Sequence, residues 1–444
     1  MSLDLNSLLN NYLVETSPLR QFFWRKERQA GGTSYPIPIK EQYVDFLKVI
    51  LGLHIIERER LDYVKELKIT TSYPYNFFSI VSKLESLFFL LSNLKMKLRV
   101  VPKSSRCIWK KLDEGFPYQK VVLFSSGLDS LCGALELSED YKVVLAHCIT
   151  NQVIFSKILK LANMPHLQRS ILYCCNARTK ETTGGISETR GLLFLSFAYA
   201  IAASLDLKSI VFCENGSQML DVMLGPLVYP NKPATKNTNL MYIEKIEDIF
   251  SSFNDSEFKI EYPYKDRTKA EMLNSFKDRI RFEDTFSCFS TRYRTAMCGI
   301  CWNCFIRRVS MLAIDVEEEY NTYETNPFEF VYEMSQKESY KNEMNILYHL
   351  LRFYYKIATM DSSAQDEVRI STRDYFGNSI SLVTRFAKDI FLGVMKLLQT
   401  TDEARLNPLG KKAKELLDQI DERTLMERKE ELMKRVRTAT SKES

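Results

Sequence analysis

A run of small and turn-forming residues follows a short apolar stretch at 121–134. Residues 121–124 are all apolar and predict a buried strand, while apolar spacing from Leu131 onward predicts a helix. The turn between them contains Ser125, Ser126, Gly127, Leu128, Asp129 and Ser130. Backbone N–H groups at a helix N-terminus favour anions, and Asp129 could hold a Mg²⁺ that bridges phosphates. The loop therefore predicts a phosphate site; the alternative is an ordinary strand–helix turn with a serine cap.

Four of the ten cysteines lie within seventeen residues, at Cys288, Cys298, Cys301 and Cys304. Three of them are spaced i, i+3, i+6, and Gly299 lets the backbone tighten around them. Four thiolates suit a closed, tetrahedral, structural Zn²⁺ site, although an iron–sulfur cluster takes the same ligands and a chance cluster of buried thiols is a third interpretation. The four histidines of the chain lie elsewhere, so a catalytic zinc with an open position is not expected.

Further polar side chains follow other predicted strands or begin predicted helices. Arg190 precedes a nearly continuous apolar helix. A cation at a helix N-terminus opposes the helix dipole, so a bound anion there would explain the arginine. The alternative is an ordinary surface arginine. Glu214 and Asn215 directly follow a strand, and Glu214 either accepts hydrogen bonds from the N–H edge of a guanine-like base or caps a turn. Lys265 and Lys269 flank Thr268, which with Glu271 predicts a capping box, and both lysines are phosphate-binding candidates.

Strands alternate with helices from residue 121 onward, with apolar strands predicted near 143–149, 170–175 and 209–213. This order predicts a doubly wound parallel sheet with right-handed crossovers. Ligands of such sheets bind beyond the carboxyl ends of the strands, where the 121–134 loop lies. We expect three segments: an α/β N-terminal extension over 1–115, a nucleotide-type domain over 116–320, and a helical C-terminal region over 321–444.

The terminal segments carry weaker signals. An aromatic-basic stretch over 20–28 is either a nucleic-acid contact or a packed helix with a solvated basic face. The charge-dense stretch 411–437 predicts a long exposed helix, which either docks a partner or packs on its own domain.

The bulk composition is that of a globular protein: 444 residues, 45% hydrophobic and 26% charged, with a net charge of +5. The most apolar stretch is far too short to span a bilayer, and the N-terminus carries no basic signal region. We therefore expect a soluble, cytoplasmic protein with no membrane partner, and the charge alone is weak evidence for nucleic-acid binding.

The serine-rich loop resembles the Ser-Gly-Gly-x-Asp-Ser signature of PP-loop ATP pyrophosphatases, with Ser126 where that family has its first glycine. It is neither a Walker A loop nor a dinucleotide fingerprint. Together with Arg190, the Pro263 and Thr268-Lys269 segment, the four cysteines and Arg307, the loop resembles QueC, the 7-cyano-7-deazaguanine synthase family. The resemblance covers roughly 118–315 and implies a PP-loop, adenine nucleotide alpha hydrolase-like fold.

The resemblance implies an enzyme that uses ATP and Mg²⁺ to adenylate the carboxylate of a 7-carboxy-7-deazaguanine-type substrate, releasing pyrophosphate and leaving AMP after transfer to an amine. It implies ATP binding by residues 125–130, catalytic roles for Asp129, Ser130 and Lys269, substrate binding by Arg190, Glu214 and Asn215, and a structural zinc held by the four cysteines.

With its long extensions, the chain looks most like the QueC-like proteins of bacterial anti-phage defence operons, such as QatC of the Qat system or the QueC-like protein of CBASS operons. That likeness suggests a protein partner from the same operon as the amine acceptor. Two alternatives stay open: a tRNA-modifying PP-loop enzyme, and a non-catalytic scaffold that binds a defence partner.

Overall fold

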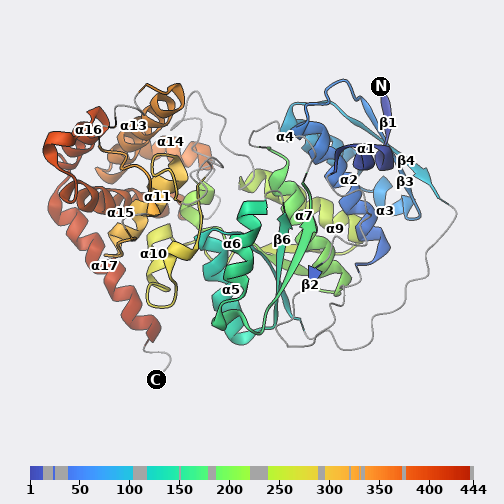
Figure 1. Ribbon diagram of the computed structural model, residues 1–444, viewed down its shortest axis with the longest axis horizontal. Helices are drawn as coiled ribbons and strands as arrows, with labels where there is room; N and C mark the ends of the chain where they lie inside the picture. The colour runs from blue at the N-terminus through green and yellow to red at the C-terminus, as the bar shows by residue number, and fades with distance from the viewer. Residues whose placement is uncertain are drawn as a thin grey trace. The chain divides into compact units, whose positions relative to one another are not determined.

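The computed structural model describes most of the chain, and Figure 1 traces its helices and strands. The described residues are 1–13, 24–25, 39–103, 118–149, 152–178, 187–220, 239–288, 296–319, 322–329, 331, 336–372 and 377–440. Most of the aromatic-basic stretch 20–28 lies outside these ranges, as does the loop 221–238 that follows Glu214 and Asn215.

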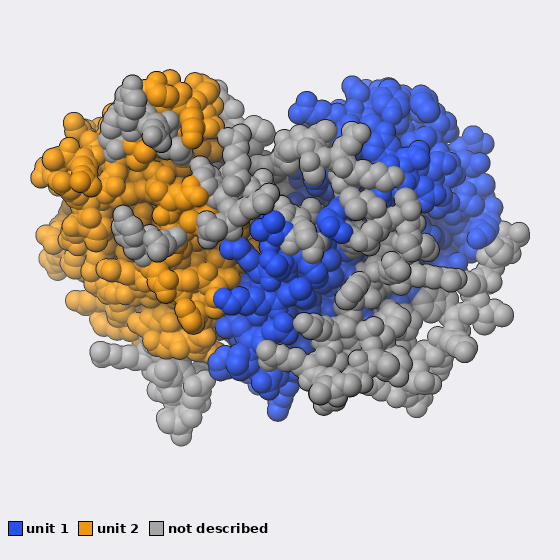
Figure 2. Space-filling model, in the orientation of Figure 1, with its two compact units in different colours: residues 1–125, 133–213, 235–263 blue, residues 126–132, 214–234, 264–444 orange. Residues whose placement is uncertain are grey.

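The described chain forms two compact units, coloured separately in Figure 2. Unit 1 comprises residues 1–125, 133–213 and 235–263, and unit 2 comprises residues 126–132, 214–234 and 264–444. The serine-rich loop and the segment after residue 213 thus belong to the same unit as the C-terminal helices. The three-segment division at 115 and 320 remains a prediction about domains.

A six-stranded sheet forms the centre of unit 1, in the order β2-β7-β6-β5-β8-β9. Its strands are β2 (Trp24–Arg25), β7 (Ile171–Asn176), β6 (Val143–Ile149), β5 (Lys120–Leu123), β8 (Ser209–Val211) and β9 (Lys259–Glu261). All neighbours are parallel except β2, which pairs antiparallel with β7. The chain order reverses at β5, so the predicted loop follows the strand at the switch point of the sheet, where ligands of such folds bind.

Helices cover both faces of this sheet. In Figure 1, α6 (Gln152–Ala162) lies on one side of β6, while α7 (Arg190–Ser204) and α9 (Leu240–Asn254) lie on the other. The predicted doubly wound α/β sheet is therefore confirmed. Helix α7 is almost entirely buried, as its continuous apolar sequence predicts, but it has only 15 residues. None of the described helices is both long and apolar enough to cross a membrane.

The N-terminal extension has its own parallel sheet, in the order β1-β3-β4, and its helix α2 packs against α7, which in turn contacts strands of the larger sheet. Its elements are β1 (Ser2–Asp4), α1 (Leu5–Tyr12), α2 (Glu41–Arg58), β3 (Glu66–Thr71), α3 (Pro74–Phe78), α4 (Val81–Ser92) and β4 (Lys97–Pro102). Rings from α2, α7 and α9 meet in one aromatic cluster: Phe46 lies 5.5 Å from Tyr199, and Tyr199 stacks on Phe250 at 4.2 Å. The predicted α/β extension is confirmed, and its largest helix shares a core with the main sheet.

Unit 2 is mainly helical. Its helices are α10 (Lys269–Asn274), α11 (Trp302–Ala313), α13 (Glu338–Ala358), α14 (Ser362–Thr372), α15 (Ser379–Gln399), α16 (Pro408–Leu417) and α17 (Glu422–Thr440), together with the start of α5 (Leu128–Asp140). Helix α11 packs closely on α15, and both contact other helices of the C-terminal region. The predicted helical C-terminal region is confirmed.

The prediction of a single long exposed helix over 411–437 is wrong. The segment forms two helices, α16 and α17, separated at 418–421. Leu425, Arg428 and Leu432 of α17 are buried. A charge-dense helix can pack its charges inward when they meet opposite charges on other elements, and that occurs here.

Candidate functional site

The loop between β5 and α5 is anchored to the segment that leads into the cysteine cluster. The Phe286 backbone N–H donates to the Ser126 carbonyl oxygen at 2.7 Å, and the Ser126 hydroxyl donates to the Phe286 carbonyl oxygen at 3.0 Å. Within the loop, the Ser130 hydroxyl donates to the Gly127 carbonyl oxygen at 3.1 Å. Leu128 is buried, so it can present only its backbone to a ligand. Ser125 is the last residue of unit 1 before the loop enters unit 2.

These contacts give Ser126 a specific task. Its side chain is buried and supplies one of the two hydrogen bonds that dock the loop on Phe286. A glycine at this position would keep the backbone bond and lose the hydroxyl bond. Serine in place of the first glycine of the PP-loop signature is therefore explained by a local anchor.

Replacing Ser126 by glycine is expected to lower the free energy of unfolding by about 1–2 kcal/mol, because a buried hydrogen bond is lost and the unfolded chain gains freedom. Phosphate-ligand affinity should change little, since the backbone N–H remains. Urea unfolding of Ser126→Gly beside Ser126→Ala separates the two causes, because alanine removes only the hydroxyl. Equal stability of both variants and the wild type would contradict the anchoring role.

Asp129, Lys269 and Asn215 come together in unit 2 from three separate stretches of the chain. The Lys269 ammonium lies 2.5 Å from Asp129 Oδ1, and Asn215 Nδ2 donates to Asp129 Oδ2 at 2.6 Å. The side chains of Lys269 and Asp129 are only 7% and 9% exposed. A buried ion pair of this kind gains little net stability over an apolar pair, which fits a set of charges retained for binding or chemistry.

Gln218 completes this cluster and was not among the residues predicted for the site. Its Oε1 accepts from Lys269 Nζ at 2.9 Å and from Asn215 Nδ2 at 2.5 Å. Asn215 is itself held because its Oδ1 accepts from the Ser217 hydroxyl at 2.6 Å. Gln218 follows Asn215 by three residues at the start of a helical turn, so i, i+3 spacing was the signal that could have found it.

The Glu214-Asn215-Gly216 segment requires glycine at its third position. The Gly216 N–H donates to the Tyr264 carbonyl oxygen at 2.9 Å. A Cβ added at Gly216 would lie 1.7 Å from the Lys265 carbonyl oxygen. The backbone before Lys269 therefore crosses directly over this glycine, and the close approach brings the lysine and the Asn215 segment together.

Lys269 is the first residue of α10. Thr268 caps this helix: its hydroxyl accepts from the Glu271 N–H at 3.2 Å, and Glu271 Oε2 accepts from the Thr268 N–H at 3.0 Å. The predicted capping box is confirmed. It fixes the direction in which the first residue of the helix leaves the backbone.

Glu214 has an unusual acidity. Burial and the nearby Asp129 carboxylate raise its pKa to about 8, and the Lys269 ammonium only partly opposes them. At neutral pH the group is therefore mostly protonated and can donate a hydrogen bond. Perturbed carboxyl groups next to a charged pair are typical of functional sites.

This shift has a consequence for stability. Between about pH 5 and 8, the folded chain keeps a proton on Glu214 that the unfolded chain has already lost, so rising pH favours unfolding by up to about 1.4 kcal/mol per pH unit. Glu214→Gln is expected to remove this contribution and flatten the decline. Urea unfolding at several pH values measures it, with exposed Glu317→Gln as the control; parallel curves for Glu214→Gln and the wild type would refute the shift.

Arg190 lies in unit 1 and is not among the groups that unit 2 brings together. It begins α7, with its guanidinium 5.0 Å from the centre of the Phe194 ring. The turn before it is held by Glu57 of α2, whose carboxylate accepts from the Thr189 hydroxyl at 2.9 Å and the Glu188 N–H at 3.1 Å. The N-terminal extension thus holds the turn that presents Arg190.

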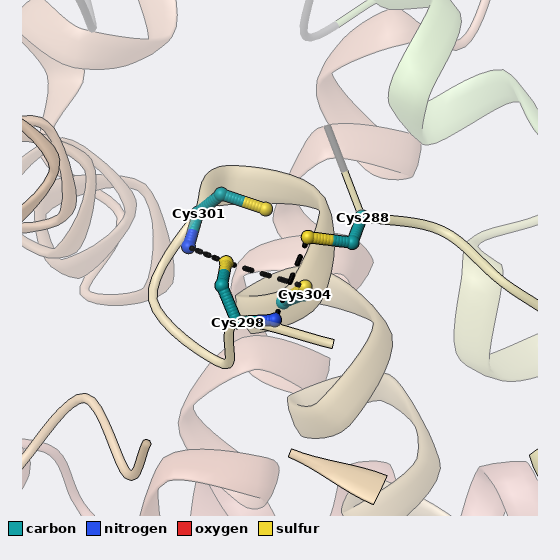
Figure 3. Close-up of side chains that lie close together, drawn as sticks. All are labelled: Cys288, Cys298, Cys301 and Cys304. Atoms are coloured by element: carbon teal, nitrogen blue, oxygen red, sulfur yellow. Dashed lines mark hydrogen bonds between the residues drawn. The ribbon is translucent and has the colours of Figure 1, made fainter. Parts of the chain in front are cut away.

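The four cysteines form the cluster that their spacing predicts (Figure 3). All four are buried, and their sulfur atoms lie within 4.8 Å of one another. Cys298 Sγ and Cys304 Sγ are 3.8 Å apart, and tetrahedral zinc with Zn–S bonds of about 2.3 Å places its sulfur atoms roughly 3.8 Å apart. Gly299 has φ +79°, the left-handed turn that the Cys-Gly-x-Cys spacing needs. The donor set therefore fits a structural zinc ion.

The cluster is tied to the loop through Arg307. This arginine is fully buried in α11, which begins just after Cys301, and it pairs with Glu318 at 2.5 Å. It also donates to the Thr285 hydroxyl and to the Phe282 carbonyl oxygen, each at 2.6 Å. The segment 282–285 runs into Phe286, which holds Ser126. The cysteine cluster, Arg307 and the loop therefore belong to one connected set of contacts in unit 2.

Residues 149–314 match the family model described as queuosine biosynthesis protein QueC. The matched segment includes Arg190, Glu214, Asn215, Lys269 and the four cysteines, and it begins after the 125–130 loop. The match supports a QueC-like segment with a PP-loop fold and ATP-dependent, synthase-type chemistry. No match was found among curated proteins or among solved structures.

Proposed function

We propose, from the QueC-like match over 149–314, that the chain adenylates the carboxylate of a 7-deazaguanine acid with ATP and transfers the acyl group to an amine. The observation that supports this most directly is the buried Asp129–Lys269 pair at the start of the helix that follows the serine-rich loop. A buried lysine beside a helix N-terminus suits a polyphosphate, and the carboxylate beside it suits the associated divalent cation.

The reaction has two steps. A carboxylate oxygen attacks the α-phosphorus of ATP, and the bond from that phosphorus to the bridging oxygen breaks and releases pyrophosphate. The amine nitrogen then attacks the acyl carbon, AMP leaves, and the nitrogen loses a proton. The loop N–H groups and the Lys269 ammonium would stabilise the charge that develops on pyrophosphate, with Ser130 supporting the loop. A Mg²⁺ held by Asp129 would supply further neutralisation of the phosphate charge.

Substrate recognition in this proposal uses Glu214 and Asn215 of unit 2, while a substrate-binding role for Arg190 of unit 1 stays a prediction from the sequence. With its pKa raised to about 8, Glu214 is protonated at neutral pH before a ligand binds and can donate a hydrogen bond. A ligand with an N–H edge, such as a guanine-like base, would favour the ionised carboxylate and release the proton.

An ATP–pyrophosphate exchange assay tests the chemistry. Exchange of labelled pyrophosphate into ATP that depends on 7-carboxy-7-deazaguanine supports the proposal. Turnover that depends on tRNA instead would identify a tRNA-modifying enzyme, and no exchange with either substrate would favour a non-catalytic scaffold.

The proposed setting is the bacterial cytoplasm, in anti-phage defence, with an operon-encoded protein as the amine acceptor. Co-expression of that partner with the wild type and with Asp129→Ala, followed by intact-mass spectrometry, tests the acceptor. A mass increase that depends on Asp129 supports a protein acceptor; an unchanged partner mass in both samples would point to a small-molecule amine.

A further inference from the structure

Arg428 of α17 lies at the centre of a buried charge network. Its side chain is 1% exposed. Its Nε donates to Asp389 Oδ1 of α15 at 2.8 Å, and its Nη2 donates to Glu271 Oε1 of α10 at 2.7 Å. Its remaining nitrogen, Nη1, pairs with Glu431 at 2.7 Å. One arginine thus joins three helices of unit 2.

Both halves of the α10 capping box are held by this network. The Thr268 hydroxyl donates to Asp389 Oδ2 at 2.5 Å, and Glu271 is also paired with Arg385 of α15. Arg385 further donates to the Asp266 carbonyl oxygen at 3.1 Å. The N-cap residue, its capping partner and the approaching backbone are therefore all tied to α15 or α17.

The two arginines keep Glu271 in the ionised form in which it completes the capping box. Burial alone would raise the pKa of Glu271, but Arg428 and Arg385 outweigh burial and lower it. Glu271 is therefore ionised at neutral pH and accepts the Thr268 N–H as a carboxylate. Buried Arg428 pairs with both buried carboxylates, Glu271 and Asp389, and the partly exposed Arg385 pairs with Glu271, so each buried carboxylate has a cationic partner.

Helix α10 needs this support. It has only six residues, which is far below the length at which a helix is stable by itself. Its first residue is Lys269, whose ammonium lies 2.5 Å from Asp129 Oδ1. A small rotation at the start of such a short helix would move the end of this long side chain away from its partner.

We propose that Arg428 and Asp389 are positioning residues for Lys269: the C-terminal helices lock the start of α10 so that the lysine is held for the phosphates of ATP. The inference rests on the proposed ATP site, and it assigns the C-terminal region a role inside that site. We therefore expect the loss of a network residue to weaken ATP binding by displacing Lys269, and not by lowering the stability of the whole fold.

A double-mutant cycle on the full chain tests this, with MgATP as the titrant in isothermal titration calorimetry. Lys269→Ala and Arg428→Met are each expected to raise the MgATP dissociation constant by roughly tenfold, and the double variant should bind no more weakly than Lys269→Ala alone. Arg423→Met is the matched control, because Arg423 lies on the same helix with an exposed side chain paired to Glu427. It should bind MgATP like the wild type.

Further variants and two folding controls keep the test decisive if Arg428→Met does not fold. Zinc content and circular dichroism establish that each variant is folded. Thr268→Val removes the hydroxyl that caps the Glu271 N–H and donates to Asp389, and it should weaken MgATP binding in the same direction. Arg428→Lys, which keeps the charge but not the forked geometry, should fall between the wild type and Arg428→Met. If Arg428→Met does not fold, these two variants decide.

The outcomes separate the inference from its premise. Unchanged MgATP binding in Lys269→Ala would overturn the proposed ATP site and this inference with it. If Lys269→Ala binds MgATP more weakly but folded Arg428→Met binds it normally, the inference alone is overturned. The same holds if Thr268→Val and Arg428→Lys both bind MgATP normally. Fully additive losses in the double variant would also overturn it, since Arg428 would then act independently of Lys269.

Discussion

Lys269→Ala is expected to lower the rate of ATP–pyrophosphate exchange by about 10²-fold or more, a size typical of removing a positioned group that stabilises transition-state charge. Two causes act together. The ammonium proposed to meet the leaving pyrophosphate is lost. Asp129 and Glu214 are also left without their nearby cation, and Asp129 already raises the pKa of Glu214. Initial rates at saturating ATP and deazaguanine acid measure the effect.

Lys277→Ala provides the control for this experiment. Lys277 lies eight residues later in the same unit, beyond the end of α10. Its removal leaves the contacts of Asp129, Asn215 and Gln218 intact. Equal exchange rates for Lys269→Ala and the wild type would remove Lys269 from the chemistry, whereas equal losses in both lysine variants would point to a general charge effect.

Cys304→Ala is expected to abolish stoichiometric zinc binding and to lower the free energy of unfolding by on the order of 5 kcal/mol, because structural zinc sites provide about 10–16 kcal/mol of binding free energy in small peptides. Cys304 is fully buried at the first turn of α11, so its loss affects the metal and the helix that carries Arg307. Elemental analysis and thermal denaturation measure the two effects. The wild type should be colourless, with about one zinc per chain.

This variant should also weaken MgATP binding. Cys288 lies two residues after Phe286, whose backbone exchanges hydrogen bonds with Ser126. Loosening the cluster therefore loosens the loop. Cys174→Ala is the matched control, since it removes an equally buried thiol from β7, outside the cluster. Retention of full zinc content in Cys304→Ala, or a brown wild-type protein with visible absorbance, would contradict a zinc site of four thiolates.

Much of the main sheet could be predicted from the sequence. The strands near 143–149, 170–175 and 209–213 appear in the structure as β6, β7 and β8. They were predictable because strands of a parallel sheet are buried on both faces and therefore form continuous apolar runs. The apolar run after Arg190 forms α7, since a helix that is apolar on all sides is buried on all sides. The Thr268–Glu271 capping box was also predictable, since capping depends on residues three positions apart.

The packing of the C-terminal helices could not be predicted in the same way. Helix α17 has the charge pattern of a solvated helix, and Arg423 and Lys434 do lie on its exposed side. Arg428 has the same residue type and helical setting, yet it is buried because Asp389 and Glu271 lie 39 and 157 positions away in the chain. Sequence periodicity predicts which residues share one face of a helix, but it does not predict which other elements pack against that face.

Short stretches of sequence were enough to predict the local chemistry: a serine-rich turn after a strand, four cysteines at metal-binding spacing, and a capped lysine. Each depends on residues close together in the chain, where bond geometry limits the possible arrangements. Long-range packing alone brings Asp129, Asn215, Gln218 and Lys269 together. It also docks Ser126 on Phe286 and pairs Arg428 with Glu271 in α10. These contacts join distant segments, and their geometry follows from how the helices and strands pack around a shared core.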